Sequence, residues 1–368
     1  MESFLFWDTA WFNQYFRHGL SFGRTFHHYS LGDACHNFCL SQAPLTIRSR
    51  LSYNCLMKKL VLIDGNAIIH RAFHALPPLS NKDGQPTNAV YGFFTMLLKI
   101  LEDLKPEYLV VCFDKKAPTF RKQLYVGYQA TRPKPSDDLV PQFEMVHKAL
   151  DKAQVKHFAI DGYEADDLIG TIAVQAKAKN LQTIIVSGDR DLLQLVNGQV
   201  LMLAPIIGMT KMTMFDEVKV REKYGLEPWQ IVDYKALVGD ASDNYPGVTG
   251  IGPKTASSLL SKYQTLEGIY EHLAELSPQI QEKLAQDAEQ AALAKKLATI
   301  VLDVPVKLDE EEAEISKIDD RALKIVFEKL GFKSLLGRLS KEKKVKAQNS
   351  PSQETKENKD DSEQMNLL

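Results

Sequence analysis

Short apolar runs alternate with longer amphipathic stretches along residues 57–200. Four of the runs are continuous rather than alternating, as in strands buried on both faces of a sheet: LVLIDG (60–65), YLVVCFD (108–114), VKHFAI (155–160) and TIIVSGD (183–189). Residues 88–104, about 138–153, and 161–179 carry apolar positions at helical spacing. This order of strands and helices predicts an α/β fold with a parallel sheet.

Acidic residues follow the predicted strands. Asp64 ends the first strand, Asp114 ends the second, and Asp189 and Asp191 follow the fourth. In an open parallel sheet, ligands bind outside the carboxyl ends of the strands, which lie at one edge. We therefore expect these four aspartates to converge on one crevice.

The helix that follows the third strand adds Glu164, Asp166 and Asp167 at the same edge. Helix capping is an alternative explanation, because Asp161 and Glu164 have the spacing of a capping box and acids are favoured in a first helical turn. Capping leaves the acids at the strand ends unexplained. Seven carboxylates in one crevice stay ionised only if cations lie among them.

A ligand set of oxygens, without histidine or cysteine, favours hard ions such as Mg²⁺ or Mn²⁺. This many carboxylates can hold two ions, and a pair of metals is the usual arrangement for in-line displacement at phosphorus. The sequence therefore predicts a two-metal site that acts on a phosphate group.

The segment KKAPTFRKQLYVGYQATRPKP (115–135) contains six lysines or arginines and no acid, with Phe120, Tyr125 and Tyr128 interleaved. A solvated basic loop is the alternative for any such run. This run, however, starts directly after Asp114 and so overhangs the predicted crevice. Cations combined with aromatic rings are typical of elements that bind single-stranded nucleic acid.

A second signal lies in VGDASDNYPGVTGIGPKTASSLL (238–260), where Asp240 and Asp243 extend the acidic set to nine residues. A glycine-rich turn then leads into a helix with Pro253 at its predicted first position. The free N–H groups of such a helix end can bind phosphate. Together with Lys254, this turn predicts a clamp on the backbone of duplex DNA.

Over residues 57–340 these motifs resemble the 5′ nuclease domain of bacterial DNA polymerase I, a relative of the flap endonucleases. The motifs are LVLIDGNAIIHRAFHAL, VVCFDKKAPTFR, GYEADDLIG, VSGDRDLLQL and VGDASDNYPGVTGIGPKTA. The resemblance implies an α/β, PIN-like (resolvase-like) nuclease core at 57–225 with a helical arch at 115–136. A mostly helical DNA-binding region with a helix–three-turn–helix motif is implied at 226–340.

The resemblance also implies the roles of single residues. Asp64, Asp114, Glu164, Asp166 and Asp167 would surround a first metal ion, and Asp189, Asp191, Asp240 and Asp243 a second. The implied DNA contacts are Arg71, Phe120, Arg121, Lys122, Tyr128, Arg132, Lys134, Gly250, Gly252, Lys254 and Thr255. In relatives, the helix–three-turn–helix motif also binds a monovalent cation such as K⁺. The nucleophile would be a metal-bound water, and no side chain is assigned that role.

One position departs from the family pattern. Many relatives carry a lysine after the tyrosine of the arch, where this sequence has Gln129. That lysine helps to neutralise the scissile phosphate. Arg121, Arg132 and Lys134 are candidates to replace it.

The expected activity is metal-dependent hydrolysis of DNA near 5′ ends, flaps, nicks and junctions, in primer removal and repair. One alternative is a non-catalytic, structure-specific DNA-binding module, although none of the expected acids is missing. Another is a toxin-like RNA nuclease, which the basic run and residues 238–260 disfavour. We expect a monomer in the bacterial cytoplasm, associated with the nucleoid. No apolar run reaches the ~18 residues of a membrane span, and the net charge of −2 indicates no global basic field.

The two ends differ from the rest of the chain. Residues 1–56 contain no lysine, and they predict a non-homologous extension, disordered or from a mis-called start, with an organellar transit peptide as the alternative. Their His and Cys residues fit no common zinc pattern. Residues 341–368 predict a disordered tail. The tail ends in QMNLL, in which Gln364, Met365, Leu367 and Leu368 resemble the peptides that dock bacterial proteins on the sliding clamp; a frayed terminus is the alternative.

Overall fold

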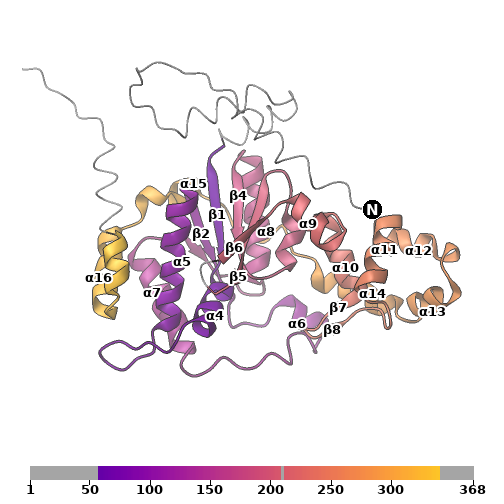
Figure 1. The fold of residues 1–368 in the computed structure, drawn as a ribbon, viewed down its shortest axis with the longest axis horizontal. Coiled ribbons are helices and arrows are strands. Elements are labelled where there is room, and N and C mark those ends of the chain that lie inside the picture. The colour runs from indigo at the N-terminus through magenta and orange to yellow at the C-terminus, as the bar shows by residue number, and fades with distance from the viewer. Residues whose placement is uncertain (1–56, 209–210, 340–368) are drawn as a thin grey trace, which may run out of the picture. The chain divides into compact units, whose positions relative to one another are not determined.

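The computed structural model describes residues 57–208 and 211–339 (Figure 1). All described residues belong to one compact unit. The predicted extension at 1–56 and the predicted clamp peptide at 364–368 lie outside the described residues. Within the described part, no helix has the length and apolar character needed to cross a membrane.

A six-stranded sheet forms the centre of the described unit, in the spatial order β3-β2-β1-β4-β5-β6. Its strands are β1 (Lys59–Asp64), β2 (Tyr108–Cys112), β3 (His157–Phe158), β4 (Gln182–Val186), β5 (Val200–Ile207) and β6 (Lys211–Phe215). The first five are parallel and β6 runs antiparallel to β5, so the prediction of a mostly parallel α/β sheet is confirmed. β3 is shorter than the predicted 155–160, because an edge strand pairs on one side only.

Alternate residues of β1 point to opposite faces of the sheet, and both faces are covered. Val61 and Ile63 pack with buried residues of α4 (Gly65–Ala75), α5 (Asn88–Leu104) and α7 (Val140–Lys152). Leu60 and Leu62 pack on the other face with residues of α8 (Ala165–Ala178). Figure 1 shows the sheet between these helices. Burial on both faces explains why the strand reads as an unbroken apolar run.

The start of α8 differs from the prediction. The helix begins at Ala165 with Glu164 as its N-cap, not at Asp161. The backbone at Gly162 is left-handed (φ 86°), which ends any helical path before it. The exposed carboxylate of Asp161 instead forms an ion pair with Lys115 at 3.0 Å. The capping box considered as an alternative at Asp161 and Glu164 is therefore not formed, and α8 has its capping box at Glu164 and Asp167 instead.

A mostly helical region follows the sheet: α9 (Glu217–Tyr224), α10 (Ile231–Val238), α11 (Pro253–Tyr263), α12 (Leu266–Glu271), α13 (Pro278–Gln286) and α14 (Ala288–Ala298). Its buried apolar residues, among them Leu237, Ile251 and Leu260, form a cluster of their own. A small hairpin of β7 (Gly239–Asp240) and β8 (Tyr245–Pro246) lies between α10 and α11. Pro253 is the first residue of α11, as predicted.

The chain then returns to the α/β core. Along α8, the backbone N–H of Val304 donates to the Thr171 hydroxyl (3.1 Å), and that of Leu308 donates to the Gln175 side chain (2.7 Å). After the short α15 (Glu310–Ala313), α16 (Asp320–Leu330) contributes buried residues to the core face that holds α7. Residues 300–339, expected within the helical DNA-binding region, thus pack on the nuclease core, because their apolar side chains complete it.

Candidate metal centre at the carboxyl edge of the sheet

The first carboxylates lie at the ends of β1 and β2 and are held by donors from neighbouring segments. Asp64 accepts a hydrogen bond from the backbone N–H of Ala67 (2.9 Å) and another from the Ser187 hydroxyl (2.7 Å). Asp114 accepts from the backbone N–H of Ala165 at the start of α8 (2.7 Å). Burial, and then the charge of Asp114, raises the pKa of Asp64 to about 7.

Asp166 of α8 lies close enough to these aspartates for their charges to affect it. Burial raises its pKa well above the usual value, and the charges of Asp189, Asp64 and Asp114 add to the effect. The carboxylates of β1, β2, β4 and α8 therefore interact electrostatically at one edge of the sheet, whereas the described acids whose oxygens lie within 4.8 Å of one another are Asp191, Asp240 and Asp243. Such mutual repulsion in a buried site is relieved by divalent cations, and the donor set consists of oxygen atoms alone.

Asp167, the next residue in the chain, is placed differently. Its two carboxylate oxygens each accept a 2.8 Å hydrogen bond from the guanidinium of Arg121. Oδ1 also accepts from the backbone N–H of Val301 (2.9 Å), and Oδ2 accepts from that of Glu164 (3.1 Å). With two donors on each oxygen and no solvent exposure, Asp167 has no free ligand position. It is part of the structural frame and not one of the carboxylates that face the cleft.

Arg121 lies within the arch (115–136) but does not face solvent. Its side chain is 3% exposed, and it donates to the carbonyl oxygens of Leu297 and Thr299 (both 2.9 Å) in addition to Asp167. Although burial opposes its charge, Asp167 raises the pKa of the guanidinium. The expected contact of Arg121 with DNA therefore has no support in its position, and the residue cannot replace the missing arch lysine.

Tyr128 is also buried, contrary to the exposed ring that stacking on a base requires. Its hydroxyl lies 3.1 Å from Glu164 Oε2 and 3.3 Å from Asp243 Oδ2, and it can donate to one of them at a time. Burial, and then the two carboxylates, raises its pKa, so Tyr128 is a neutral donor. It links the first carboxylate group to the second.

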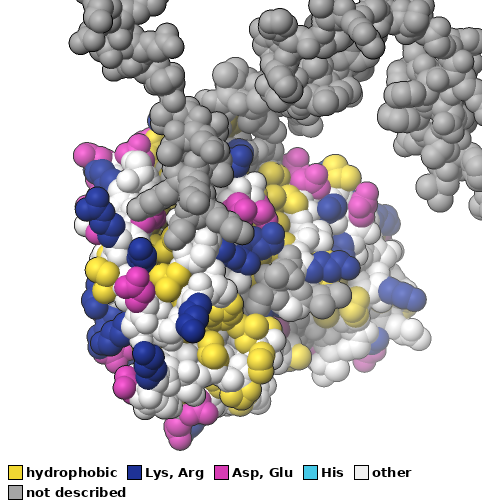
Figure 2. Space-filling model, turned by 60° about the vertical axis from the view of Figure 1, so that its left-hand side comes forward, with side chains coloured by type: hydrophobic (Ala, Val, Ile, Leu, Met, Phe, Trp, Pro, Cys, Tyr) yellow, Lys and Arg dark blue, Asp and Glu magenta, His cyan; other side chains and the backbone are white. Residues whose placement is uncertain are grey.

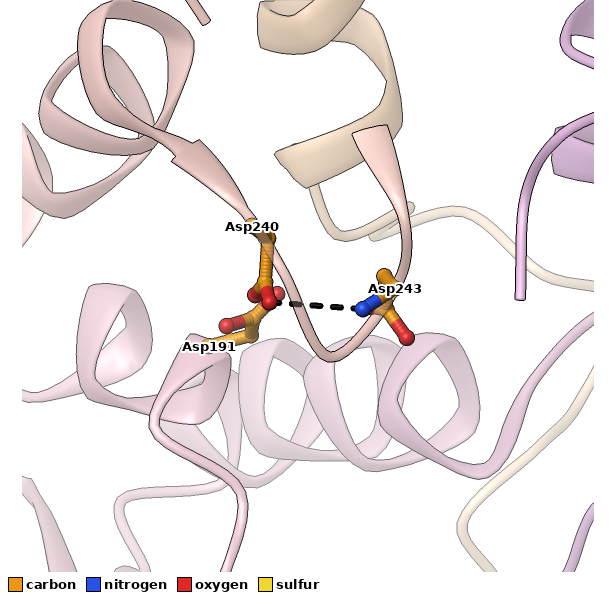
Figure 3. Close-up of side chains that lie close together, drawn as sticks. All are labelled: Asp191, Asp240 and Asp243. Atoms are coloured by element: carbon orange, nitrogen blue, oxygen red, sulfur yellow. Dashed lines mark hydrogen bonds between the residues drawn. The ribbon is translucent and has the colours of Figure 1, made fainter. Parts of the chain in front are cut away.

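The second group comprises Asp191, Asp240 and Asp243, each of which offers one oxygen within 4.8 Å of the others. Figure 3 shows the Asp191 and Asp240 side chains close together, and the backbone N–H of Asp243 donates to Asp240 (3.3 Å). Asp191 follows β4 and Asp240 follows α10, so the α/β core and the helical region each supply part of the group. A site of this kind can hold a divalent cation.

Lys235 of α10 was not predicted as a site residue, yet its ammonium group forms ion pairs with both Asp191 and Asp240. Burial opposes the ionisation of Asp240, but Lys235 and Ser242 hold the pKa of that carboxyl below its usual value. No sequence pattern marks Lys235, because lysines are common on helices and its contacts depend on tertiary folding. An internal cation thus balances this carboxylate pair.

The arch (115–136) also contacts Asp243. Arg132 donates to Asp243 Oδ1 at 2.7 Å, and the Gln129 amide donates to the same oxygen at 3.2 Å. The Gln129 backbone is left-handed (φ 55°) and its N–H donates to the Asp243 carbonyl oxygen (2.8 Å). Lys122 and Lys134 are exposed. Of the predicted arch cations, Arg121 pairs with the buried Asp167, and the partly exposed Arg132 pairs with Asp243.

The remaining predicted DNA contacts are spread over other elements. Phe120 is half-buried with its ring against the Arg121 guanidinium (4.6 Å). Lys254 and Thr255 lie in the first turn of α11, after Gly252 at the N-cap. Lys283 donates to the carbonyl oxygen of Gly250, which has a positive φ of 76°. Arg71 of α4 donates to the carbonyl oxygen of Gly208 (2.7 Å). Lys254 is exposed in the first turn of α11.

Two family models match this chain. That of the N-terminal resolvase-like domain of 5′-3′ exonuclease matches residues 59–225, and that of the C-terminal SAM fold matches residues 226–321. A 5′-3′ exonuclease of Aquifex aeolicus is 39% identical over 285 residues, which are 77% of this chain and 96% of that protein. DNA polymerase I of Bacillus subtilis is 41% identical over 286 residues, and the chain spans only 32% of its length.

Solved structures share the fold at low sequence identity. The bacteriophage T5 5′-exonuclease with bound zinc ions has a TM-score of 0.56 and 20% identity, with 77% of this chain and 100% of that one covered. The catalytic core of Rad2 in complex with DNA substrate has a TM-score of 0.52 and 15% identity, with 78% and 94% covered. These matches agree with the mostly parallel sheet and the helical region that follows it. With its two matched domains and a 39% identical relative of which it covers 96%, the chain belongs to the 5′-3′ exonuclease family.

Proposed function

We propose that this protein hydrolyses DNA phosphodiester bonds near 5′ ends, at flaps, nicks and duplex junctions, with two divalent cations bound at the carboxyl edge of the sheet. The observation that supports the proposal is the placement of carboxylates from four core elements and the helical region at one edge of the sheet, with Asp64, Asp191 and Asp243 buried there. Their oxygen-only donor set suits Mg²⁺ or Mn²⁺. When bound, such ions neutralise phosphate charge and supply an activated water.

The first ion would be held by Asp64, Asp114, Glu164 and Asp166, and the second by Asp189, Asp191, Asp240 and Asp243. The other residues of the site orient these ligands. Ser187 holds Asp64, Tyr128 donates to Glu164 or Asp243, and Arg132 holds Asp243. No side chain is proposed as the nucleophile. Outside the metal groups, Lys254 and the N-terminus of α11 are proposed to bind the backbone of the duplex.

Asp189→Ala tests the assignment. It should lower the single-turnover rate on labelled 5′-flap DNA with Mg²⁺ by at least about a hundredfold. Its affinity for the same DNA in metal-free buffer should remain close to that of the wild type. Asp161→Ala is the matched control, because Asp161 is an exposed acid that pairs with Lys115. Cleavage by Asp189→Ala at the wild-type rate would contradict the assignment of Asp189 as a metal ligand. Binding without cutting by the wild type would favour a non-catalytic module instead.

Single-stranded RNA in the same assay distinguishes the alternative RNA nuclease. Preferential cleavage of that RNA, with flap DNA left intact, would contradict the proposal. We further propose a role in RNA primer removal and DNA repair in the bacterial cytoplasm, at the nucleoid, as a monomer. A K⁺ ion is proposed at the turn that precedes α11.

We also propose that the end of the tail docks on the sliding clamp through Gln364, Met365, Leu367 and Leu368. The tail would raise the concentration of the nuclease on DNA without fixing its orientation. A peptide of residues 360–368 should bind the clamp of the source organism, and a peptide with Gln364→Ala and Leu367→Ala should not. Equal or undetectable binding by both peptides would end this proposal.

A further inference from the structure

Residues 127–132 of the arch are hydrogen-bonded to the loop of the β7–β8 hairpin, which carries Asp243. The side-chain amide of Asn244, in the same loop, donates to the carbonyl oxygen of Gly127 (2.7 Å). The backbone N–H of Gln129 donates to the carbonyl oxygen of Asp243 (2.8 Å). Figure 1 shows α6 of the arch beside this hairpin. The arch is therefore attached to the segment that supplies part of the second carboxylate group.

Both carboxylate oxygens of Asp243 face donors of the arch. Oδ1 accepts from the guanidinium of Arg132 (2.7 Å) and from the side-chain amide of Gln129 (3.2 Å), and the Tyr128 hydroxyl lies 3.3 Å from Oδ2. The side chain of Asp243 is 9% exposed, whereas that of Arg132 is 49% exposed. Arg132 is thus a cation held at the rim of the metal centre, and it can leave toward solvent.

A divalent ion and Arg132 compete for Asp243. This carboxylate offers one oxygen within 4.8 Å of oxygens of Asp191 and Asp240, so an ion bound by all three would lie next to the guanidinium. Two cations at such short range repel each other strongly in a partly buried site. Carboxylate oxygens are also the preferred ligands of hard divalent ions. Binding of an ion by the second carboxylate group therefore opposes the contact between Arg132 and Asp243.

The backbone of the arch is strained beside this contact. Gln129 is left-handed (φ 55°), a conformation that costs free energy for a residue with a side chain and that persists where surrounding contacts hold it. Those contacts are the bonds of Gln129 and Arg132 to Asp243. One residue earlier, the ring of Tyr128 is buried and stacks on the ring of Tyr245, with centres 6.4 Å apart. Tyr128 is therefore a fixed point beyond which the arch can turn.

We infer that Arg132 latches the arch onto the second carboxylate group, and that a divalent ion bound by this group displaces Arg132 and releases residues 129–132 from the hairpin. The inference rests on the proposed two-metal function and adds a coupling between metal binding and the position of the arch. By linkage, the latch weakens binding of the ion by the same factor by which the ion weakens the latch. The arch would thus turn away from the metal centre when that centre is loaded.

The first experiment compares Arg132→Gln with Lys134→Gln, a change of the same charge at an exposed arch residue two positions away. Mn²⁺ is titrated into the full-length protein without DNA, and free Mn²⁺ is followed by electron paramagnetic resonance. Arg132→Gln should lower the dissociation constant of one bound Mn²⁺ at least about fivefold, because the competing cation is gone. Lys134→Gln should match the wild type.

Hydrogen exchange measured by mass spectrometry tests the release itself. The amide of Gln129 is bonded to the Asp243 carbonyl oxygen, so its exchange reports whether the turn is attached to the hairpin. Mg²⁺ should speed the exchange of residues 129–132 several-fold, and Arg132→Gln should show faster exchange in EDTA as well. The amides of the helix α5, which lies in the core, should not speed up in either case.

Unchanged or weaker Mn²⁺ binding by Arg132→Gln would overturn the latch. Exchange of residues 129–132 that Mg²⁺ slows or leaves unchanged would overturn it as well. Cleavage of flap DNA by the wild type would uphold the nuclease function even then. A wild type that binds no Mn²⁺ would contradict the two-metal function, and the latch with it.

Discussion

The carboxylate of Asp167 receives two hydrogen bonds of 2.8 Å from the guanidinium of Arg121, and both side chains are almost fully buried. Removal of one partner from a buried pair of this kind costs about 3–5 kcal/mol, because the other charge is left without compensation. Asp167→Asn is therefore expected to lower the free energy of unfolding by a similar amount. Urea denaturation in metal-free buffer measures the change.

Asp166→Asn is the matched comparison, one residue away. Because burial and neighbouring acids raise the pKa of Asp166, its removal should leave the metal-free protein at least as stable as the wild type while abolishing cleavage. Equal stability of the Asp166 and Asp167 variants would show that the ion pair with Arg121 is not a structural element.

Lys235→Met should make the protein more responsive to divalent cations. The substitution leaves Asp191 and Asp240 without their internal cation, so the metal-free protein should melt at a lower temperature. Mn²⁺ should then raise the melting temperature by more than it does in the wild type, because it no longer competes with an ammonium group. Lys235→Arg keeps the charge and should respond like the wild type. Equal shifts in the Met variant and the wild type would exclude this competition.

Gln129→Lys should increase the single-turnover cleavage rate. A lysine at this position can reach Asp243, as the Gln129 amide does, and it places a cation beside the cleft. The left-handed backbone conformation at residue 129 is equally strained for glutamine and lysine. Arg132 already contacts the same oxygen, so the increase should be larger in an Arg132→Gln background. Gln123→Lys, on the exposed face of α6 (Phe120–Leu124), is the control. A neutral or harmful Gln129→Lys would show that Arg132 supplies the required charge.

The stability of the metal-free protein should fall as the pH rises from about 4 to about 7. The pKa of Asp64 is raised to about 7, so the folded state binds a proton that the unfolded state releases near the ordinary value of 3.8. Protonation therefore favours folding within this window, and the advantage is lost as the pH passes the folded pKa. Mg²⁺ should reduce the decline, because it binds the ionised carboxylates. Melting curves with EDTA or Mg²⁺ measure both effects, and a flat profile in EDTA would contradict them.

Deletion of residues 1–56 should leave flap cleavage and thermal stability unchanged. β1 starts at Lys59 and has its hydrogen-bonded neighbours, β2 and β4, within the remaining chain. Circular dichroism melting and the flap assay compare the deleted and full-length proteins. Loss of soluble, active protein would show that the segment contributes to the fold.

The strands predicted from sequence are β1, β2 and β4, and also the edge strand β3 with longer bounds than it has. β1, β2 and β4 are continuous apolar runs because both faces and both edges are buried. β5 and β6 were not predicted: Pro205 interrupts the pattern of β5, and β6, the edge strand beside it, is exposed at Lys211. Strand pairing at an edge depends on tertiary context more than on apolar content.

The acidic residues could be predicted because the ends of parallel strands share one edge. The directions in which their side chains point could not be predicted. Asp166 and Asp167 are adjacent on α8, so their side chains point about 100° apart, one toward the carboxylate cluster and the other toward Arg121. Composition likewise indicated a basic, aromatic arch, while the burial of Arg121 and Tyr128 follows from contacts with residues more than a hundred positions away.

The return of residues 300–339 to the α/β core has a consequence for the order in which the protein can be built. Val304, Val306 and Leu308 pack with α8, and Phe327 packs on the opposite face of the sheet, so neither layer is complete until the ribosome has made the last described segment. At about 5–20 residues per second, a nascent chain that ends near residue 225 waits roughly 5–20 s for these side chains. Throughout that interval, apolar surface on both sheet faces stays accessible to chaperones. The nuclease core is therefore first present in the cell as an incompletely folded chain.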